Sequence, residues 1–104
     1  NKVILIGNNP SMTTDPLRCS GKPNQNLVLC ASFTPNADNH EINLIESNAA
    51  KGLGIPYINT VGIACTQLLC PVIISGYFVY FDQWHFTDPF VQFVSPWLAE
   101  QLNL

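Results

Sequence analysis

Four cysteines in a chain of 104 residues limit the possible folds more than any other feature of this sequence. They are Cys19, Cys30, Cys65 and Cys70, and an even number permits three complete pairings. We predict the disulfides Cys19–Cys30 and Cys65–Cys70, each of which closes a local loop. Zinc is disfavoured because the sequence lacks C-x-x-C pairs and neither histidine lies beside a cysteine. Disulfides in turn predict an oxidising location, the periplasm or the cell exterior.

The composition is that of one small domain with a hydrophobic core. Hydrophobic residues make up 47% of the chain and charged residues only 11%, against the ~25% charged residues usual in soluble domains. No apolar run approaches the ~20 residues that a membrane helix needs. The net charge is −3 and the four basic residues are scattered. Nothing here would neutralise a row of phosphates, so the sequence argues against nucleic-acid binding.

The opening residues predict a buried strand within a longer protein. Residues 2–6 are strand-forming and run into Gly7-Asn8-Asn9-Pro10, a pattern typical of a strand buried on both faces of a parallel sheet. The sequence begins at Asn1 with neither an initiator Met nor a signal-peptide pattern. We therefore expect residues 1–104 to be a segment of a longer chain, with any export signal upstream.

A loop, a helix and a second strand are predicted next. Residues 11–35 show no sustained periodicity, so we expect a long loop pinned by Cys19 and Cys30. Residues 36–54 predict a helix with Asp38 as N-cap and Glu41 three residues later, as in a capping box. Its apolar positions recur at helical spacing: Ile42, Ile45, Ala49 and Leu53. Residues 55–60 then predict a strand parallel to the first, the βαβ arrangement of an open α/β sheet.

The C-terminal third predicts a hairpin followed by a helix. Residues 72–74 and 77–81 flank Ser75-Gly76, which is typical of a β-hairpin, and the aromatic second arm is expected to pack in the core. Thr87-Asp88-Pro89 is a helix-start pattern, with Asp88 or Thr87 as the cap and Pro89 in the first turn. We expect this helix to kink or split at Pro96.

The loop between the hairpin and the final helix carries the residues best suited to chemistry. Asp82 stands three residues before His85 at the end of a predicted strand, where α/β folds place their sites. An imidazole can deprotonate a hydroxyl nucleophile, and a neighbouring carboxylate fixes its tautomer and stabilises the imidazolium. Asp-x-x-His is short enough to arise by chance, so a simple turn is the alternative on pattern alone. Trp84 is interpreted as a packing residue in preference to a substrate platform, and His40 as a surface residue.

The segment from Gly76 to Thr87, with the helix after it, resembles the last conserved block of the SGNH (GDSL-type) hydrolases. It is most similar to the C-terminal part of the SGNH domain fused to membrane acyltransferase-3 proteins, which are bacterial surface-polysaccharide O-acetyltransferases. The similarity extends over almost the whole chain and includes the strand ending in Gly-Asn-Asn-Pro and the Ile-Pro-Tyr-Ile-Asn strand. Its most specific part is the Cys65–Cys70 segment together with Asp82 and His85.

The resemblance implies a fold and two catalytic roles. His85 would be the general base that deprotonates a serine, and Asp82 would orient and stabilise His85. The fold would be part of a flavodoxin-like, three-layer α/β domain with a parallel sheet, plus the hairpin before the catalytic loop. Residues 1–104 would form the C-terminal portion of that single SGNH domain, and the nucleophile would lie in its N-terminal portion. The serines here all lack a Gly-Asp-Ser-like setting, so none is nominated: Ser11, Ser20, Ser32, Ser47, Ser75 and Ser95.

One short motif at the N-terminus matches the family only superficially. Gly7-Asn8-Asn9 looks like the Gly-x-Asn block that supplies an oxyanion donor in SGNH enzymes. Its distance from Asp82 and the following Pro10 fit the next strand of the sheet better. We interpret Asn8 and Asn9 as turn residues at the end of a strand.

The function that the resemblance implies is acetyl transfer to a cell-envelope glycan. A membrane acyltransferase-3 domain would pass the acetyl group across the bilayer, and a serine ester would carry it to the glycan acceptor, without metal or organic cofactor. The domain would be extracytoplasmic and tethered to the membrane in the full-length protein, and the fragment alone would be inactive. Two alternatives stay open: an SGNH esterase or deacetylase, and a non-enzymatic, disulfide-stapled module.

Overall fold

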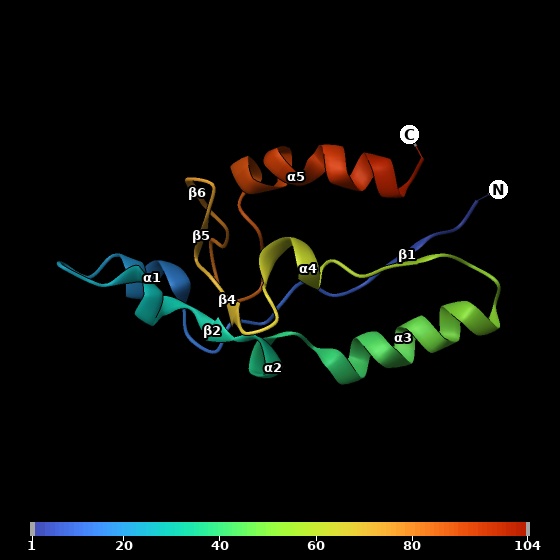
Figure 1. The fold of residues 1–104 in the computed structure, drawn as a ribbon, viewed down its shortest axis with the longest axis horizontal. Coiled ribbons are helices and arrows are strands. Elements are labelled where there is room, and N and C mark those ends of the chain that lie inside the picture. Colours follow the sequence, from blue (N-terminus) through green and yellow to red (C-terminus); the bar gives the residue numbers. More distant parts are fainter. Residues whose placement is uncertain (1, 104) are drawn as a thin grey trace.

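The chain forms a mixed α/β structure whose short strands associate two by two (Figure 1). The structure is a computed structural model and describes residues 2–103. The strand pairs are β1 (Leu5–Ile6) with β3 (Tyr57–Ile58), β2 (Ser32–Phe33) with β4 (Leu69–Cys70), and β5 (Ile73–Ile74) with β6 (Tyr77–Phe78). The helices are α1 (Pro16–Ser20), η1 (Leu27–Cys30), α2 (Thr34–Ala37), α3 (His40–Gly52), α4 (Val61–Ala64) and α5 (Asp88–Gln101). In residues 2–103 no helix is long and apolar enough to cross a membrane.

The predicted parallel strands are present, but the first is not buried on both faces. β1 and β3 run parallel with Leu5 opposite Tyr57, and α3 leads into β3 (Figure 1). Ile6, however, is 45% exposed and Val3 is 61% exposed. Within the described residues β1 has one neighbouring strand, so its other edge has no partner there. The prediction failed because burial of a strand on both faces needs layers that residues 2–103 do not supply.

Helix α3 confirms the helix predicted over residues 36–54, with a different N-terminus. The N-cap is Asn39, which adopts the left-handed conformation (φ 53°) and makes no side-chain capping bond. Asp38, predicted as the cap, lies one residue earlier, and its Oδ1 accepts a hydrogen bond from the His40 amide at 3.1 Å. The Asp38 carboxylate therefore satisfies an end amide of the helix from outside the helix.

The apolar stripe of α3 lies at the surface. Ile42 is 55% exposed, Ile45 68% and Leu53 76%, whereas Asn43 and Ala50 are the buried residues of this helix. The spacing predicted a helix correctly, but the stripe does not contact the core of residues 2–103. Large apolar side chains on one face of a helix form a surface patch of the kind that marks an interaction site.

Residues 11–35, predicted to be a loop, contain short elements. Asp15 accepts hydrogen bonds from two amides at the start of α1, and Asn26 caps η1 in the same way. The predicted disulfide Cys19–Cys30 joins these two helices. Elements of four or five residues are too short to show periodicity in a sequence, which is why the pattern predicted a loop.

The second predicted disulfide and the hairpin are both confirmed. Cys65–Cys70 closes a small loop just before β5. β5 and β6 are joined through Ser75 (φ 51°) and Gly76 (φ 83°), which both take the left-handed conformation required by the tight turn. The second arm is shorter than predicted, since β6 ends at Phe78. Beyond it, the Val79 amide still donates to the Val72 carbonyl at 2.9 Å, and Tyr80 forms an isolated bridge with Phe86 across the next loop.

The core lies between the hairpin and the first turn of α5. Val79, Tyr80 and Phe90 are each at most 1% exposed, while Phe78 and Phe81 are 45% and 51% exposed. Only part of the aromatic arm is therefore in the core. The remaining core residues are Met12, Cys30, Ala37, Ala64, Cys70 and Val72.

Two predictions from the sequence concern α5: the identity of its N-cap and the effect of Pro96. Thr87 is the N-cap, and its hydroxyl accepts a hydrogen bond from the Phe90 amide at 3.2 Å, so Asp88 is the first helical residue. The helix is not split, since it runs from Asp88 to Gln101 with Pro96 inside. Pro96 has no amide for the Gln92 carbonyl, and the Ser95 hydroxyl donates to that carbonyl instead, at 2.9 Å.

The Tyr80 hydroxyl provides a first test of the packing. It is buried without a hydrogen-bond partner among residues 2–103, and burial raises its pKa. Because Tyr80→Phe removes an unsatisfied polar group, we expect it to keep or raise the free energy of unfolding, by up to about 1 kcal/mol. Tyr57→Phe is the matched control: its hydroxyl donates to Asn43 Oδ1 at 3.0 Å, and its loss should cost about 1 kcal/mol. Urea unfolding with intact disulfides measures both, and a destabilised Tyr80→Phe variant would contradict the expectation.

Candidate active site

The loop between β6 and α5 is held from two sides. The Phe81 amide donates to the His85 carbonyl at 3.1 Å, which closes the loop on itself. The Met12 amide donates to the Gln83 carbonyl at 2.8 Å, and Gln83 Nε2 donates to the Met12 carbonyl at 3.2 Å. These bonds tie the loop to the N-terminal segment, so residues far apart in the sequence share one site.

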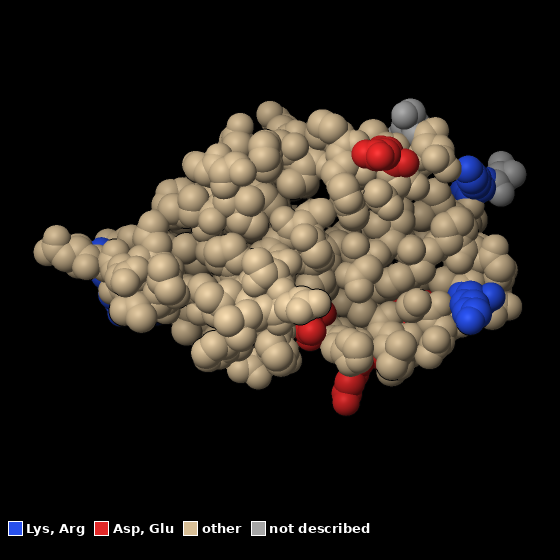
Figure 2. Space-filling model, viewed as in Figure 1, with Lys and Arg blue, Asp and Glu red and all other residues tan. Residues whose placement is uncertain are grey.

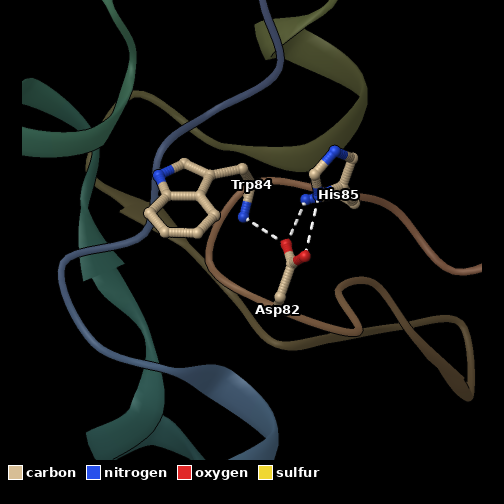
Figure 3. A network of polar contacts seen from close by, with 3 residues as sticks. All are labelled: Asp82, Trp84 and His85. Atoms are coloured by element: carbon tan, nitrogen blue, oxygen red, sulfur yellow. Dashed lines mark hydrogen bonds and ion pairs between the residues drawn. The ribbon is translucent and has the colours of Figure 1, made fainter.

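Asp82 and His85 form the contact that the sequence predicted (Figure 3). His85 Nδ1 lies 2.7 Å from Asp82 Oδ2, and the other carboxylate oxygen accepts hydrogen bonds from the Trp84 and His85 amides, each at 2.7 Å. The two amides fix the carboxylate so that Oδ2 faces the imidazole. The His85 ring also stacks on Phe81, with ring centroids 5.4 Å apart and planes 16° apart. Both groups are reachable from solvent, with the His85 side chain 64% and the Asp82 side chain 33% exposed.

The hydrogen bonds to Asp82 determine the protonation of the pair. Partial desolvation raises the pKa of the Asp82 carboxyl, but hydrogen bonds from the Trp84 amide and from the His85 ring and amide outweigh it. The net pKa lies below the usual 3.8. An ionised carboxylate only accepts hydrogen bonds, so Nδ1 of His85 carries the proton between them. In neutral His85, Nε2 then has a free lone pair and can act as a base.

An open groove of about 500 Å³ lies beside His85. One side is formed by Trp84 and His85, and the rest by the loop after β1 and the start of α3. The lining residues are Gly7, Asn8, Asn9, Ser11, Asn39, Ile42, Trp84 and His85. The groove joins the predicted acid–base loop to the Gly-Asn-Asn segment after β1, a link that the sequence pattern does not predict.

Two asparagines at the start of α3 hold this segment in place. The Asn43 side chain is 5% exposed; its Oδ1 accepts from the Asn8 amide at 3.0 Å and its Nδ2 donates to the Asp38 carbonyl at 3.0 Å. Asn39 Nδ2 donates to the Asn9 carbonyl at 2.7 Å. Gly7 is required here because a Cβ at that position would clash with the Tyr57 hydroxyl.

Ser11 is the serine that lines this groove, but it is not paired with the imidazole. Its hydroxyl accepts a hydrogen bond from Asn39 Nδ2 at 3.1 Å. In residues 2–103 the ring of His85 hydrogen-bonds to Asp82 alone. The described residues thus contain a base and its orienting acid without a serine engaged by them.

The structure changes two interpretations from the sequence. Trp84 is 54% exposed, so its interpretation as a packing residue is wrong. Asn8 and Asn9 follow the end of β1, as predicted, but they lie in an irregular segment and not in a regular turn, and they line the groove with His85. Their superficial match to a Gly-x-Asn motif was the signal that could have pointed to the groove. His40 is exposed, as predicted.

No protein-family model matches the chain, and neither a curated protein nor a solved structure matches it. Within residues 2–103 there is no group of three or more His, Cys, Asp or Glu side chains that could hold a metal ion. The features that bear on function are therefore the Asp82–His85 pair, the groove beside it and the disulfides.

Proposed function

We propose that this chain is the base-bearing segment of an SGNH-type O-acyltransferase that moves an acetyl group to a cell-envelope glycan. The observation that carries the proposal is the 2.7 Å contact of His85 Nδ1 with Asp82 Oδ2, in a carboxylate oriented by two backbone amides. This arrangement leaves Nε2 as the free base at the edge of an open groove. It is the arrangement that serine-type acyl transfer requires of its base and acid.

In this mechanism His85 transfers one proton in each half-reaction. Nε2 takes the proton of a serine hydroxyl as the serine oxygen attacks the carbonyl carbon of the acetyl donor, and Asp82 stabilises the imidazolium. The imidazolium then protonates the leaving group, and the acetyl group is left as a serine ester. A glycan hydroxyl next attacks that ester while Nε2 takes its proton, and this proton returns to the departing serine oxygen. The steps balance without a metal or organic cofactor.

The proposed nucleophile belongs to the N-terminal part of the same SGNH domain. Two surfaces support a partner of this kind: the unpaired edge of β1 beside Ile6, and the exposed stripe of α3 that includes Ile45 and Leu53. Further parallel strands added at β1 and a layer over α3 would complete a three-layer, flavodoxin-like domain. The two disulfides fit an extracytoplasmic location, where a membrane-embedded acyltransferase-3 partner would deliver the acetyl group.

The second candidate is an esterase or deacetylase, and it is favoured by the 64% exposure of the His85 side chain. A base this open to solvent can activate water as readily as a sugar hydroxyl. The two functions share every residue and differ in the acceptor.

A transfer assay separates the candidates. The full-length protein that carries the nucleophile is incubated with an acetyl ester, with and without a glycan acceptor, and acetylated glycan and free acetate are measured. We expect acetylated glycan to form and to increase with acceptor concentration at the expense of free acetate. Hydrolysis that is unaffected by any glycan would support the esterase, and the absence of both products would support the non-enzymatic module.

A further inference from the structure

We infer that the groove beside His85 binds an uncharged saccharide, with the Trp84 indole as a stacking surface and the Asn9 carboxamide as a hydrogen-bonding group. The role of this saccharide as the acetyl acceptor rests on the proposed function. Its binding does not, because it is inferred from the groove lining and from the charges just outside that lining.

Trp84 lines the groove with a side chain that is exposed to solvent. Its backbone amide donates to Asp82, but its indole makes no hydrogen bond within residues 2–103, and the residue is 54% exposed. In Figure 3 the indole and the imidazole lie on either side of the Asp82 carboxylate. An exposed indole presents a flat apolar face with negative electrostatic character. The C–H face of a sugar ring is apolar and slightly positive, so it matches this surface.

The polar groups of the groove suit hydroxyl groups. The Asn8 side chain is already engaged by Asn43 and Glu46, whereas the Asn9 carboxamide has no hydrogen-bond partner within the described residues. A free carboxamide offers two donors and an acceptor. Sugar hydroxyls both donate and accept, so one saccharide can satisfy Asn9 while its ring lies on Trp84.

The charges around the groove select against acidic saccharides. Its lining contains no Lys, Arg, Asp or Glu. Just outside, Glu46 accepts a hydrogen bond from the Asn8 side chain, and Asp82 holds His85. Figure 2 shows basic side chains only towards the two ends of the long axis on the face drawn, with acidic side chains nearer its middle. A uronic or sialic acid would meet two carboxylates and no fixed cation, which leaves uncharged sugars as the class that fits.

A titration of this chain tests the inference directly. The sequence contains two tryptophans. Trp97→Phe leaves Trp84 as the only one, so the fluorescence and the indole NMR signal of Trp84 report on the groove. Neutral glucan and galactan oligosaccharides are compared with uronic-acid oligosaccharides of equal length at low ionic strength. We expect saturable shifts of the Trp84 signals with at least one neutral oligosaccharide, and about tenfold weaker binding of acidic ones.

Two further variants complete the test. Trp84→Ala should weaken neutral binding about tenfold relative to the Trp97→Phe control, as loss of an aromatic stacking contact predicts. Asn9→Ala should weaken it without disturbing the indole, with binding of both variants measured by calorimetry. Equal or tighter binding of acidic oligosaccharides, or unchanged binding by Trp84→Ala, would overturn the inference.

The failure of this inference differs from failure of the proposed function. If the full-length protein transfers acetyl groups but Trp84→Ala leaves the acceptor KM unchanged, the saccharide does not bind at this groove and the function stands. If neutral oligosaccharides bind at Trp84 but no acyl chemistry is found, the groove is a saccharide site without the proposed enzyme activity.

Discussion

Replacement of His85 by alanine is expected to lower acetyl transfer by the full-length protein by roughly 10⁴-fold, because no other group in the site can take the serine proton. His85 suits this test because its side chain is 64% exposed, with a 2.7 Å contact to Asp82 and a stacking contact with Phe81. A side chain this exposed contributes little to folding, so the variant should unfold at nearly the same denaturant concentration. Initial rates at saturating acetyl donor measure the loss.

Asp82→Asn is the companion variant and should lower the rate by a comparable factor. An amide there offers both a donor and an acceptor, so it no longer dictates which nitrogen of His85 carries the proton.

The contribution of the Asp82 carboxylate to the free energy of unfolding depends on pH, and the sign of this dependence is definite. The pKa of Asp82 is depressed in the folded chain, after partial desolvation is outweighed by hydrogen bonds from the Trp84 amide and from His85. Its stabilising contribution is therefore present above the pKa of the unfolded chain and lost as pH falls through the folded pKa.

His40→Ala is the matched control for the catalytic variants. It removes the second histidine of residues 1–104, which is exposed on α3 and outside the groove beside His85. Its rate should equal that of the unaltered protein. A His85→Ala variant that folds and keeps full activity would end the catalytic proposal. Loss of activity in Ser11→Ala equal to that in His85→Ala would place the nucleophile inside this chain.

The features that the sequence predicted correctly are those set by local chemistry. Cys65 and Cys70 are close enough in the chain to pair without any knowledge of the fold, and Ser75-Gly76 is a turn because Gly76 tolerates a positive φ. Asp82 and His85 meet because both lie in one short loop. In each case the interacting groups are separated by only a few residues, so the local sequence pattern is enough to predict the contact.

The predictions that failed concern burial and contacts between distant segments, which depend on what surrounds each element. The spacing of Ile42 and Ile45 predicts a helix, but it cannot tell whether another layer covers that face. Trp84 has the composition of a packing residue, yet neighbours decide its burial, and within residues 2–103 it stays exposed. The groove was missed for the same reason, since it joins Asn9 to His85 through contacts between distant segments.

Phe90→Ala is expected to destabilise the chain by about 3–5 kcal/mol, the cost of emptying a large aromatic site in a core. Phe90 is 0% exposed, and its ring meets Phe86 edge-on with centroids 5.2 Å apart. It lies in the first turn of α5, so it fixes the helix against the hairpin and holds the far end of the loop that carries His85. A loss of this size is a large part of the roughly 5–15 kcal/mol that stabilises a typical domain.

Phe93→Ala separates burial from simple removal of an aromatic ring. Phe93 lies on the same helix but is 44% exposed, and it stacks on Tyr77 with centroids 4.8 Å apart. Its ring centroid also lies 6.4 Å from that of Phe90, and losing these two aromatic contacts should cost about 1–2 kcal/mol. Guanidinium unfolding followed by circular dichroism, with the disulfides intact, compares the two variants. Equal losses would mean that α5 is not docked through Phe90, and the loop bearing Asp82 and His85 would then lack the rigid support that general-base catalysis at Nε2 requires.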